Sequence, residues 1–446
     1  MKTKNKAALV ILMVLITSFF VGCAGQIVAV GTSYKSKTVC SEVFVAGRAP
    51  ETILQELLID DLEPLKYIKT DIDYDEKTVT SSFYGIKEFK TVYSDQYGCS
   101  LGVSTDELVT GELVTGFPAE SFESNFEIDL NTTNIKRIVN ESFVESDSEK
   151  KRRTRAVVIL HKGNLIAEQY SDDINSDTPL LGWSVTKSVM NALTGILVRQ
   201  GRVDLEMKVF PTGKKDGREN ITVSHLLNMT SGLEFNEELS DPLADVVRMI
   251  LQEKDMAEFA TSKDMNSAPG TTWYYSSGNT VLLSKLMHNI LGTTDYRSFP
   301  TKELFNRIGM EHPFLESDST GTFVGSSFMY ATARDWARFG QLYLQDGVWE
   351  NERLLPEGWV KYSVTPTSVS EEHGYGAHFW LDIPEEYKSL ERVTLPEGTF
   401  HAVGHEGQFI TIVPSHNLVV VRLGKTRYPK AWEHDLFVDC VIAAME

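Results

Sequence analysis

A serine and a lysine three residues apart are the strongest candidates for chemistry in this sequence. The run Ser184-Val185-Thr186-Lys187 has the form S-x-x-K, and in a helix the side chains at positions i and i+3 lie on one face. A serine hydroxyl becomes a good nucleophile only when a neighbouring base takes its proton. A lysine can be that base if burial or nearby cations bring its pKa toward neutrality. The pair is therefore a candidate for nucleophilic catalysis, with Ser184 as nucleophile and Lys187 as its possible base.

The surroundings distinguish this motif from a second match to the same pattern. The other match begins at Ser148, inside the charged connector formed by residues 144–153. Ser184 instead opens a predicted helix, because apolar residues recur at helical spacing after it and Gly201 follows its end. The alternative is that Ser184 only caps this helix and Lys187 is a solvated surface residue.

Several other functional classes are less well supported. The segment 182–186 lacks the second glycine of a G-x-S-x-G nucleophile elbow, and no H-E-x-x-H motif or Cys/His cluster predicts a metal site. The chain has 62 acidic and 43 basic residues, a formal net charge of −19, which repels phosphate backbones. We therefore expect no metal, no organic cofactor and no nucleic-acid partner.

The N-terminus has the pattern of a signal peptide. Lysines within the first six residues precede a nearly continuous apolar stretch, residues 7–21. Phe20-Val21-Gly22-Cys23 resembles a bacterial lipobox, in which cleavage leaves a lipidated Cys23. The sequence thus predicts a signal peptide over residues 1–22 and a protein lipid-anchored in the membrane, on the extracytoplasmic side of the bacterial cell envelope. A plain secretory signal and an uncleaved anchor are the alternatives.

A small, mixed and β-rich region is predicted for residues 23–125. Residues 78–83 alternate as a strand does, and Cys40 and Cys99 flank the region. Export permits a disulfide between these cysteines, which would stabilise the fold by roughly 2–4 kcal/mol. Two separate buried thiols are the alternative.

Residues 126–446 are predicted to form an α/β catalytic domain. A hairpin over 156–167 near its start is mirrored by strands at 409–413 and 418–423 near its end, and helical patterns dominate between them. This order predicts an antiparallel sheet built from both ends of the catalytic region, with an inserted helical subdomain.

From about residue 155 to the end, the chain resembles the class C β-lactamase-related serine hydrolases. After the S-x-x-K motif, residues 269–279 (PGTTWYYSSGN) resemble the P-G-x-x-x-x-Y-S-N stretch of this group, and residues 405–408 (HEGQ) resemble its H-x-G form of K-T-G. Residues 225–233 and 330–340 are also similar to the group, which includes 6-aminohexanoate-dimer hydrolases and family VIII esterases. The resemblance implies a serine β-lactamase/transpeptidase-like fold.

The resemblance also implies catalytic roles. Ser184 would be the acylated nucleophile and Lys187 its activating partner. Tyr275 would stand where the family places a tyrosine that relays protons with the lysine. The backbone N–H groups of Ser184 and Gln408 would form the oxyanion hole.

The substrate-binding residues implied by the resemblance include one departure from the family. His405 and Gly407 would edge the pocket on the strand side. Ser277 occupies the position of the family's asparagine, and Asn279 is near enough in sequence to replace it instead. A histidine is mostly uncharged at neutral pH, so His405 predicts weak binding of substrate carboxylates.

These observations predict an exported serine hydrolase that cleaves small ester or amide substrates through an acyl-serine intermediate. An alternative hypothesis is that the protein is a D-Ala-D-Ala carboxypeptidase or a β-lactamase of the cell envelope. A hypothesis from another functional class is that it is a non-catalytic sensor of peptidoglycan fragments.

Overall fold

The computed structural model describes residues 25–59, 63–101, 132–210 and 213–445. The predicted signal peptide and the predicted lipidation site, Cys23, lie outside these ranges. None of the helices within them is long and apolar enough to cross a membrane.

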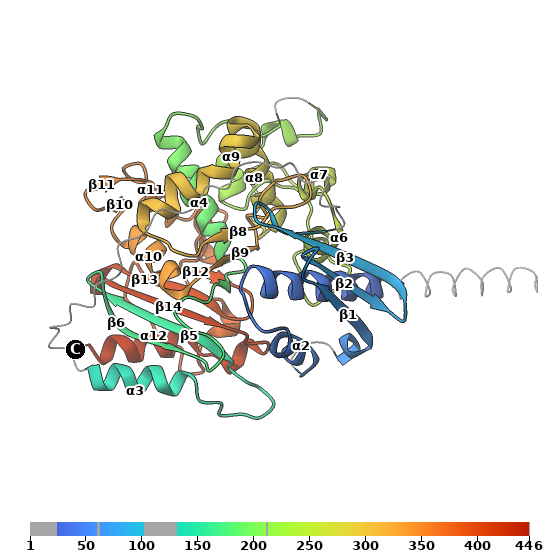
Figure 1. The fold of residues 1–446 in the computed structure, drawn as a ribbon. Helices are drawn as coiled ribbons and strands as arrows, with labels where there is room; N and C mark the ends of the chain where they lie inside the picture. Colours follow the sequence, from blue (N-terminus) through green and yellow to red (C-terminus); the bar gives the residue numbers. More distant parts are fainter. Residues whose placement is uncertain (1–24, 60–62, 102–131, 211–212, 446) are drawn as a thin grey trace, which may run out of the picture.

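A five-stranded antiparallel sheet forms the centre of the catalytic region (Figure 1). Its strand order is β12-β13-β14-β5-β6, and the pairing of Leu418 with His161 joins the C-terminal strands to the first hairpin. The prediction of a sheet built from both ends is therefore confirmed. All residues of the middle strand β14 are buried, as expected for a strand covered on both faces. The strands are β5 (Thr154–His161), β6 (Asn164–Tyr170), β12 (Phe400–Gly404), β13 (Gln408–Val413) and β14 (Leu418–Gly424).

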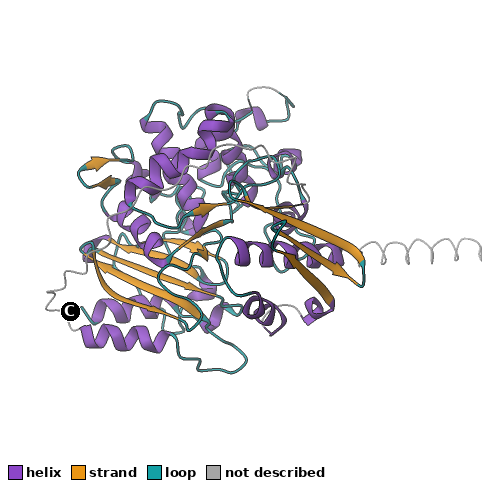
Figure 2. Cartoon of the chain, viewed as in Figure 1, coloured by secondary structure: helices purple, strands orange, loops and turns teal. Residues whose placement is uncertain are grey.

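Helices cover both faces of this sheet (Figure 2). They are α3 (Thr132–Ser142), α4 (Val185–Arg199), α10 (Ala333–Leu344) and α12 (His434–Ala443). Because side chains alternate along a strand, Val158 of β5 packs in the cluster with α4 and α10, whereas Val157 packs in the cluster with α3 and α12. Helix α4, which begins directly after Ser184, thus packs on the same face of the sheet as α10.

Most of the chain between β6 and β12 forms the helical subdomain. It contains a small sheet of order β7-β9-β8, in which β7 ends shortly before Ser184. Its remaining elements are β7 (Leu180–Leu181), α5 (Val223–Leu227), α6 (Asp245–Gln252), α7 (Met256–Ser262), α8 (Ser277–Leu291), α9 (Thr293–Pro300), β8 (Phe314–Leu315), β9 (Met329–Ala331), β10 (Val348–Trp349), β11 (Glu352–Arg353) and α11 (Trp359–Ser363).

The N-terminal region contains a four-stranded antiparallel sheet and a helix that the sequence did not predict. Residues 25–44 are helical, although valine and threonine are frequent there and favour strands locally. The helix packs against the sheet and the catalytic region, and Cys40 in it forms a disulfide with Cys99, with a Cα–Cα distance of 6.0 Å. Burial of this helix against the rest of the fold therefore outweighs the local preference of its residues for a strand. The other elements are α2 (Pro50–Ile59), β1 (Ile68–Asp73), β2 (Thr78–Phe83), β3 (Ile86–Ser94) and β4 (Gly98–Leu101).

Candidate active site

A tight turn places Ser184 at the start of α4. Trp183 has φ +48°, a left-handed conformation that is unfavourable for a bulky residue and is often found at functional sites. The Gly182 N–H donates to Met329 O at 2.9 Å and so ties the turn to β9. Ser184 makes no capping hydrogen bond with its side chain, and within the described ranges its backbone N–H donates to no protein group. The structure therefore does not support the alternative in which Ser184 only caps the helix; its hydroxyl instead lies beside Lys187.

Lys187 lies one helical turn later and is buried against Ser184. Its side chain is 1% exposed, which contradicts the alternative of a solvated lysine. Nζ lies 3.0 Å from Ser184 Oγ, 3.1 Å from Ser277 Oγ and 2.9 Å from Ser326 O. Burial lowers the pKa of Lys187 to about 8, although the negative charge of Glu237 acts in the opposite direction. A pKa of about 8 leaves a minor neutral fraction of the amine at pH 7, and this fraction can accept a proton.

Tyr275 is brought to the same place. Lys187 Nζ lies 4.8 Å from the centroid of the Tyr275 ring, and the ring packs against Tyr375 and Trp380. Burial and the charge of Glu237 raise the pKa of Tyr275 well above its ordinary value, while a hydrogen bond with Ser184 opposes this. The phenol therefore stays protonated at neutral pH. Its role as a proton relay stays a prediction.

The structure distinguishes between the two candidates for the family's asparagine position. Ser277, the first residue of α8, contacts Lys187 directly. Asn279 instead accepts a hydrogen bond from Ser231 Oγ at 2.7 Å, and its amide nitrogen lies 3.7 Å from Met229 Sδ. Ser277 is thus the residue beside Ser184 and Lys187, and Asn279 supports the neighbouring loop.

Glu237 is a member of this cluster that sequence reasoning missed. Its Oε1 accepts a hydrogen bond from Ser277 Oγ, and its Oε2 accepts one from Ser277 N–H at 2.8 Å. The residue is partly buried, and burial raises the pKa of its carboxyl group despite the opposing charge of Lys187. In the sequence it lies in an ordinary polar stretch, so no spacing or motif could have indicated it.

The predicted H-x-G element forms the turn between β12 and β13. His405 is exposed, and its ring meets the Trp183 ring edge-on with centroids 5.4 Å apart. Gly407 is buried with φ +80°. Gln408 begins β13, and its side chain donates to His405 O at 2.9 Å. A Cβ on Gly404 would lie 2.2 Å from Gly182 O, so this hairpin lies directly against the serine turn.

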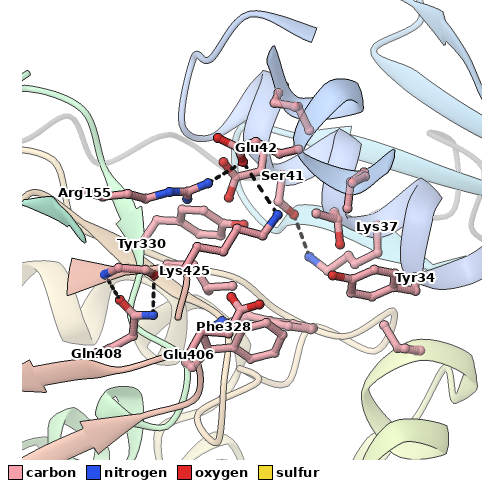
Figure 3. A pocket seen from close by; sticks show the side chains of 18 residues that line it. Tyr34, Lys37, Ser41, Glu42, Arg155, Phe328, Tyr330, Glu406, Gln408 and Lys425 are labelled. Atoms are coloured by element: carbon pink, nitrogen blue, oxygen red, sulfur yellow. Dashed lines mark hydrogen bonds and ion pairs between the residues drawn. The ribbon is translucent and has the colours of Figure 1, made fainter. Parts of the chain in front are cut away.

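A pocket next to this hairpin is lined in part by Lys425, which directly follows β14 (Figure 3). It lies between the helix over residues 25–44 and the sheet, and Trp183 and Gln408 are among its lining residues. Lys425 in this pocket lies 3.6 Å from a carboxylate oxygen of Glu56. Arg422 is fully buried and donates to Gly407 O at 2.8 Å. Both cations are therefore engaged with protein groups.

The family model described as Beta-lactamase matches residues 139–439, well over half of the chain. The chain belongs to the Beta-lactamase family. It is therefore an enzyme of the serine hydrolase type, and the resemblance inferred from the sequence motifs is confirmed. Within the described ranges, no group of three or more His, Cys, Asp or Glu side chains is arranged to hold a metal ion.

The following relatives are distant from this chain in sequence. The chain is 24% identical over 294 residues to the 6-aminohexanoate-dimer hydrolase of Paenarthrobacter ureafaciens, covering 60% of this chain and 72% of that protein. It is similar to the structure of a putative 6-aminohexanoate-dimer hydrolase from Bacillus anthracis, with a TM-score of 0.54, 20% identity and coverage of 80% and 89%. A D-stereospecific amidohydrolase from Streptomyces matches with a TM-score of 0.52, 18% identity and coverage of 69% and 98%. These structures confirm the predicted fold.

Proposed function

We propose that this protein hydrolyses small, neutral esters or amides through an acyl-enzyme intermediate on Ser184. The observation that carries the proposal is the buried Lys187 amine 3.0 Å from Ser184 Oγ, with a pKa lowered to about 8. The relatives named as a 6-aminohexanoate-dimer hydrolase and a D-stereospecific amidohydrolase support the amide part of this substrate class.

The proposed reaction proceeds in two stages. Neutral Lys187 takes the proton of Ser184 as its oxygen attacks the substrate carbonyl, and the resulting lysine ammonium protonates the leaving group. The backbone N–H groups of Ser184 and Gln408 would stabilise the oxyanion, each donor being worth roughly 10²–10³ in rate. A water molecule then attacks the acyl-enzyme while Lys187 again accepts a proton. The bond between the acyl group and Ser184 Oγ breaks, the lysine ammonium returns its proton to Ser184 Oγ, and the acid product leaves.

The charges around the site favour uncharged substrates. His405 stands where related transpeptidases have a lysine that can hold a substrate carboxylate, so this position lacks the permanently charged ammonium of a lysine side chain. Arg422 and Lys425 bind protein oxygens instead. The carboxylate of Glu237 adds negative charge beside Lys187. A substrate that carries a carboxylate would therefore bind weakly.

This preference is tested by comparing kcat/KM for p-nitrophenyl butyrate and nitrocefin. We expect a clear advantage for the neutral ester, and His405→Lys should shift the ratio toward nitrocefin. A wild-type advantage for nitrocefin would show that the charge argument is wrong.

Fluorophosphonate labelling followed by peptide mapping should place the modification on Ser184; labelling elsewhere would refute the proposed nucleophile.

We further propose that the enzyme acts in the cell envelope, anchored through a lipid on Cys23. The support is the apolar stretch at 7–21 followed by the lipobox-like residues 20–23. In a bacterial host fed radiolabelled palmitate, the full chain should incorporate label and Cys23→Ser should not. Equal incorporation by both proteins would contradict lipidation at this residue.

A further inference from the structure

A chain of hydrogen bonds connects Glu237 with the nucleophile. Ser277 donates to both carboxylate oxygens of Glu237, from its hydroxyl and from its backbone N–H. Lys187 Nζ lies 3.1 Å from the Ser277 hydroxyl oxygen and 3.0 Å from the Ser184 hydroxyl oxygen. Glu237 therefore reaches Ser184 through Ser277 and Lys187, without touching it.

The hydrogen bonds that connect Glu237 with Ser184 determine where the lone pair of the Lys187 nitrogen points. A carbonyl oxygen can only accept, so Lys187 donates to Ser326 O at 2.9 Å. The Ser277 hydroxyl directs its own hydrogen to Glu237, so it accepts from Lys187. A neutral amine on a lysine has two hydrogens and one lone pair. Because both hydrogens are used, the lone pair faces the Ser184 hydroxyl, as a general base requires.

This orientation depends on a carboxylate at position 237. An ionised carboxylate can only accept hydrogen bonds, and it fixes the hydroxyl hydrogen of Ser277 on the side away from Lys187. Without that acceptor, the hydroxyl hydrogen of Ser277 could turn toward the lysine nitrogen. It would then occupy the lone pair that Ser184 needs.

Glu237 is also the main negative charge facing the lysine among the described residues. Tyr275 and Tyr375 are kept neutral because burial raises their pKa values, and burial holds the pKa of His378 at about 3, so its imidazole is neutral too. Asp245 also faces Glu237, but it is paired with Lys263. The ammonium formed when Lys187 accepts a proton is thus balanced chiefly by Glu237.

We propose that Glu237 is a positioning residue that acts through the Ser277 hydroxyl to orient the lone pair of Lys187 and to set its proton affinity. This inference rests on the proposed function, because it assumes that Lys187 is the base. In this proposal, Ser277 and Glu237 together take the role beside the lysine that the asparagine has in the family.

The test is the pH profile of kcat/KM for p-nitrophenyl butyrate. Activity requires neutral Lys187, so in the wild type it should rise with pH through about 8. Glu237→Gln removes the charge that favours the ammonium, so the acid limb should move to lower pH by about one unit. The plateau should fall roughly tenfold, because an amide has one acceptor oxygen for the two donors of Ser277 and presents a donor to the other, so the lone pair is held less firmly toward Ser184. Glu238→Gln, an exposed neighbour bound to Ser240, is the matched control and should leave both features unchanged.

Two further variants distinguish the proposed role of Glu237 from a simple folding defect. Glu237→Asp keeps the charge but shortens the side chain, so its acid limb should stay near the wild-type position while its plateau falls. Ser277→Ala keeps the carboxylate but breaks the connection, and it should lower the plateau with a smaller shift than Glu237→Gln. An unshifted limb in folded Glu237→Gln would overturn the proposal, and so would a shift of equal size in Glu238→Gln. Failure of the proposed function would be seen separately, as a wild-type enzyme without turnover or without a label on Ser184.

Discussion

At the residue scale, the proposed catalytic activity depends on the burial of Lys187. An exposed lysine is almost fully protonated at neutral pH and cannot accept a proton. Lys187 is buried among Ser184, Ser277 and the carbonyl oxygen of Ser326, and desolvation penalises its charged form. The same three oxygens satisfy its hydrogen-bonding groups, so the neutral amine is not left unpaired.

Replacing Lys187 should separate its role as a base from its role in packing. We expect Lys187→Ala to lower kcat by roughly 10³-fold or more, measured with p-nitrophenyl acetate. Lys187→Arg should be nearly as damaging, because arginine stays protonated. Lys361→Ala, on the exposed face of α11, controls for loss of a lysine elsewhere. If Lys187→Arg kept most of the activity, the lysine would not be the proton acceptor.

At the element scale, the turn before α4 is held from two sides. The Trp336 ring of α10 lies so close to Gly182 that a Cβ there would be 2.6 Å from a ring atom. On the other side, the β12–β13 hairpin brings Gly404 against the carbonyl oxygen of Gly182. Glycine at position 182 is therefore required by space, and the turn that carries Ser184 has little freedom to move.

This constraint predicts the effect of one added methyl group. Gly182→Ala should lower the free energy of unfolding by about 1–3 kcal/mol through overpacking. It should also reduce kcat, since a displacement of about 1 Å at a reacting group can cost ~100-fold. Trp336→Phe removes part of the ring that the methyl group meets, so Gly182→Ala/Trp336→Phe should be less impaired than the sum of the single variants. Additive losses in urea unfolding and in kcat would show that this contact does not constrain the turn.

At the scale of the whole molecule, the N-terminal region is joined to the catalytic region through a buried carboxylate. Glu316 directly follows β8 and is fully buried. It accepts hydrogen bonds from Lys37 Nζ at 2.5 Å, from Ser41 Oγ at 3.0 Å and from Cys99 N–H at 2.8 Å. It therefore contacts both segments that the disulfide connects, the helix over residues 25–44 and strand β4.

Removing this carboxylate should destabilise the whole protein. Glu316→Ala leaves the buried ammonium of Lys37 without its partner, which costs about 3–5 kcal/mol in comparable buried pairs. Asp71→Ala is the matched control, because Asp71 pairs with Lys69 at 3.1 Å on the exposed surface, where such pairs contribute about 0–1 kcal/mol. Urea unfolding of the two variants measures the difference. Equal, small losses would show that Glu316 is not an important link between the regions.

The sequence by itself determined the reaction class and the outline of the catalytic domain. Ser184 and Lys187 lie in one predicted helix, and residues three apart in a helix share a face whatever surrounds it. Strand patterns at both ends of the catalytic region likewise predicted one antiparallel sheet, because apolar runs of strand length must be buried together. The sheet follows from local patterns alone, whereas the reaction class also needed the later motifs at 269–279 and 405–408 and their resemblance to a known family.

Only the tertiary structure decided which residues complete the site. Ser277 lies 90 residues from Lys187 and 40 residues from Glu237 in sequence, so no local pattern connects them. The choice of Ser277 over Asn279, the participation of Glu237 and the helix over residues 25–44 all follow from long-range packing. The lowered pKa of Lys187 has the same origin, because desolvation depends on everything that covers the amine and not on the residues adjacent to it in the chain.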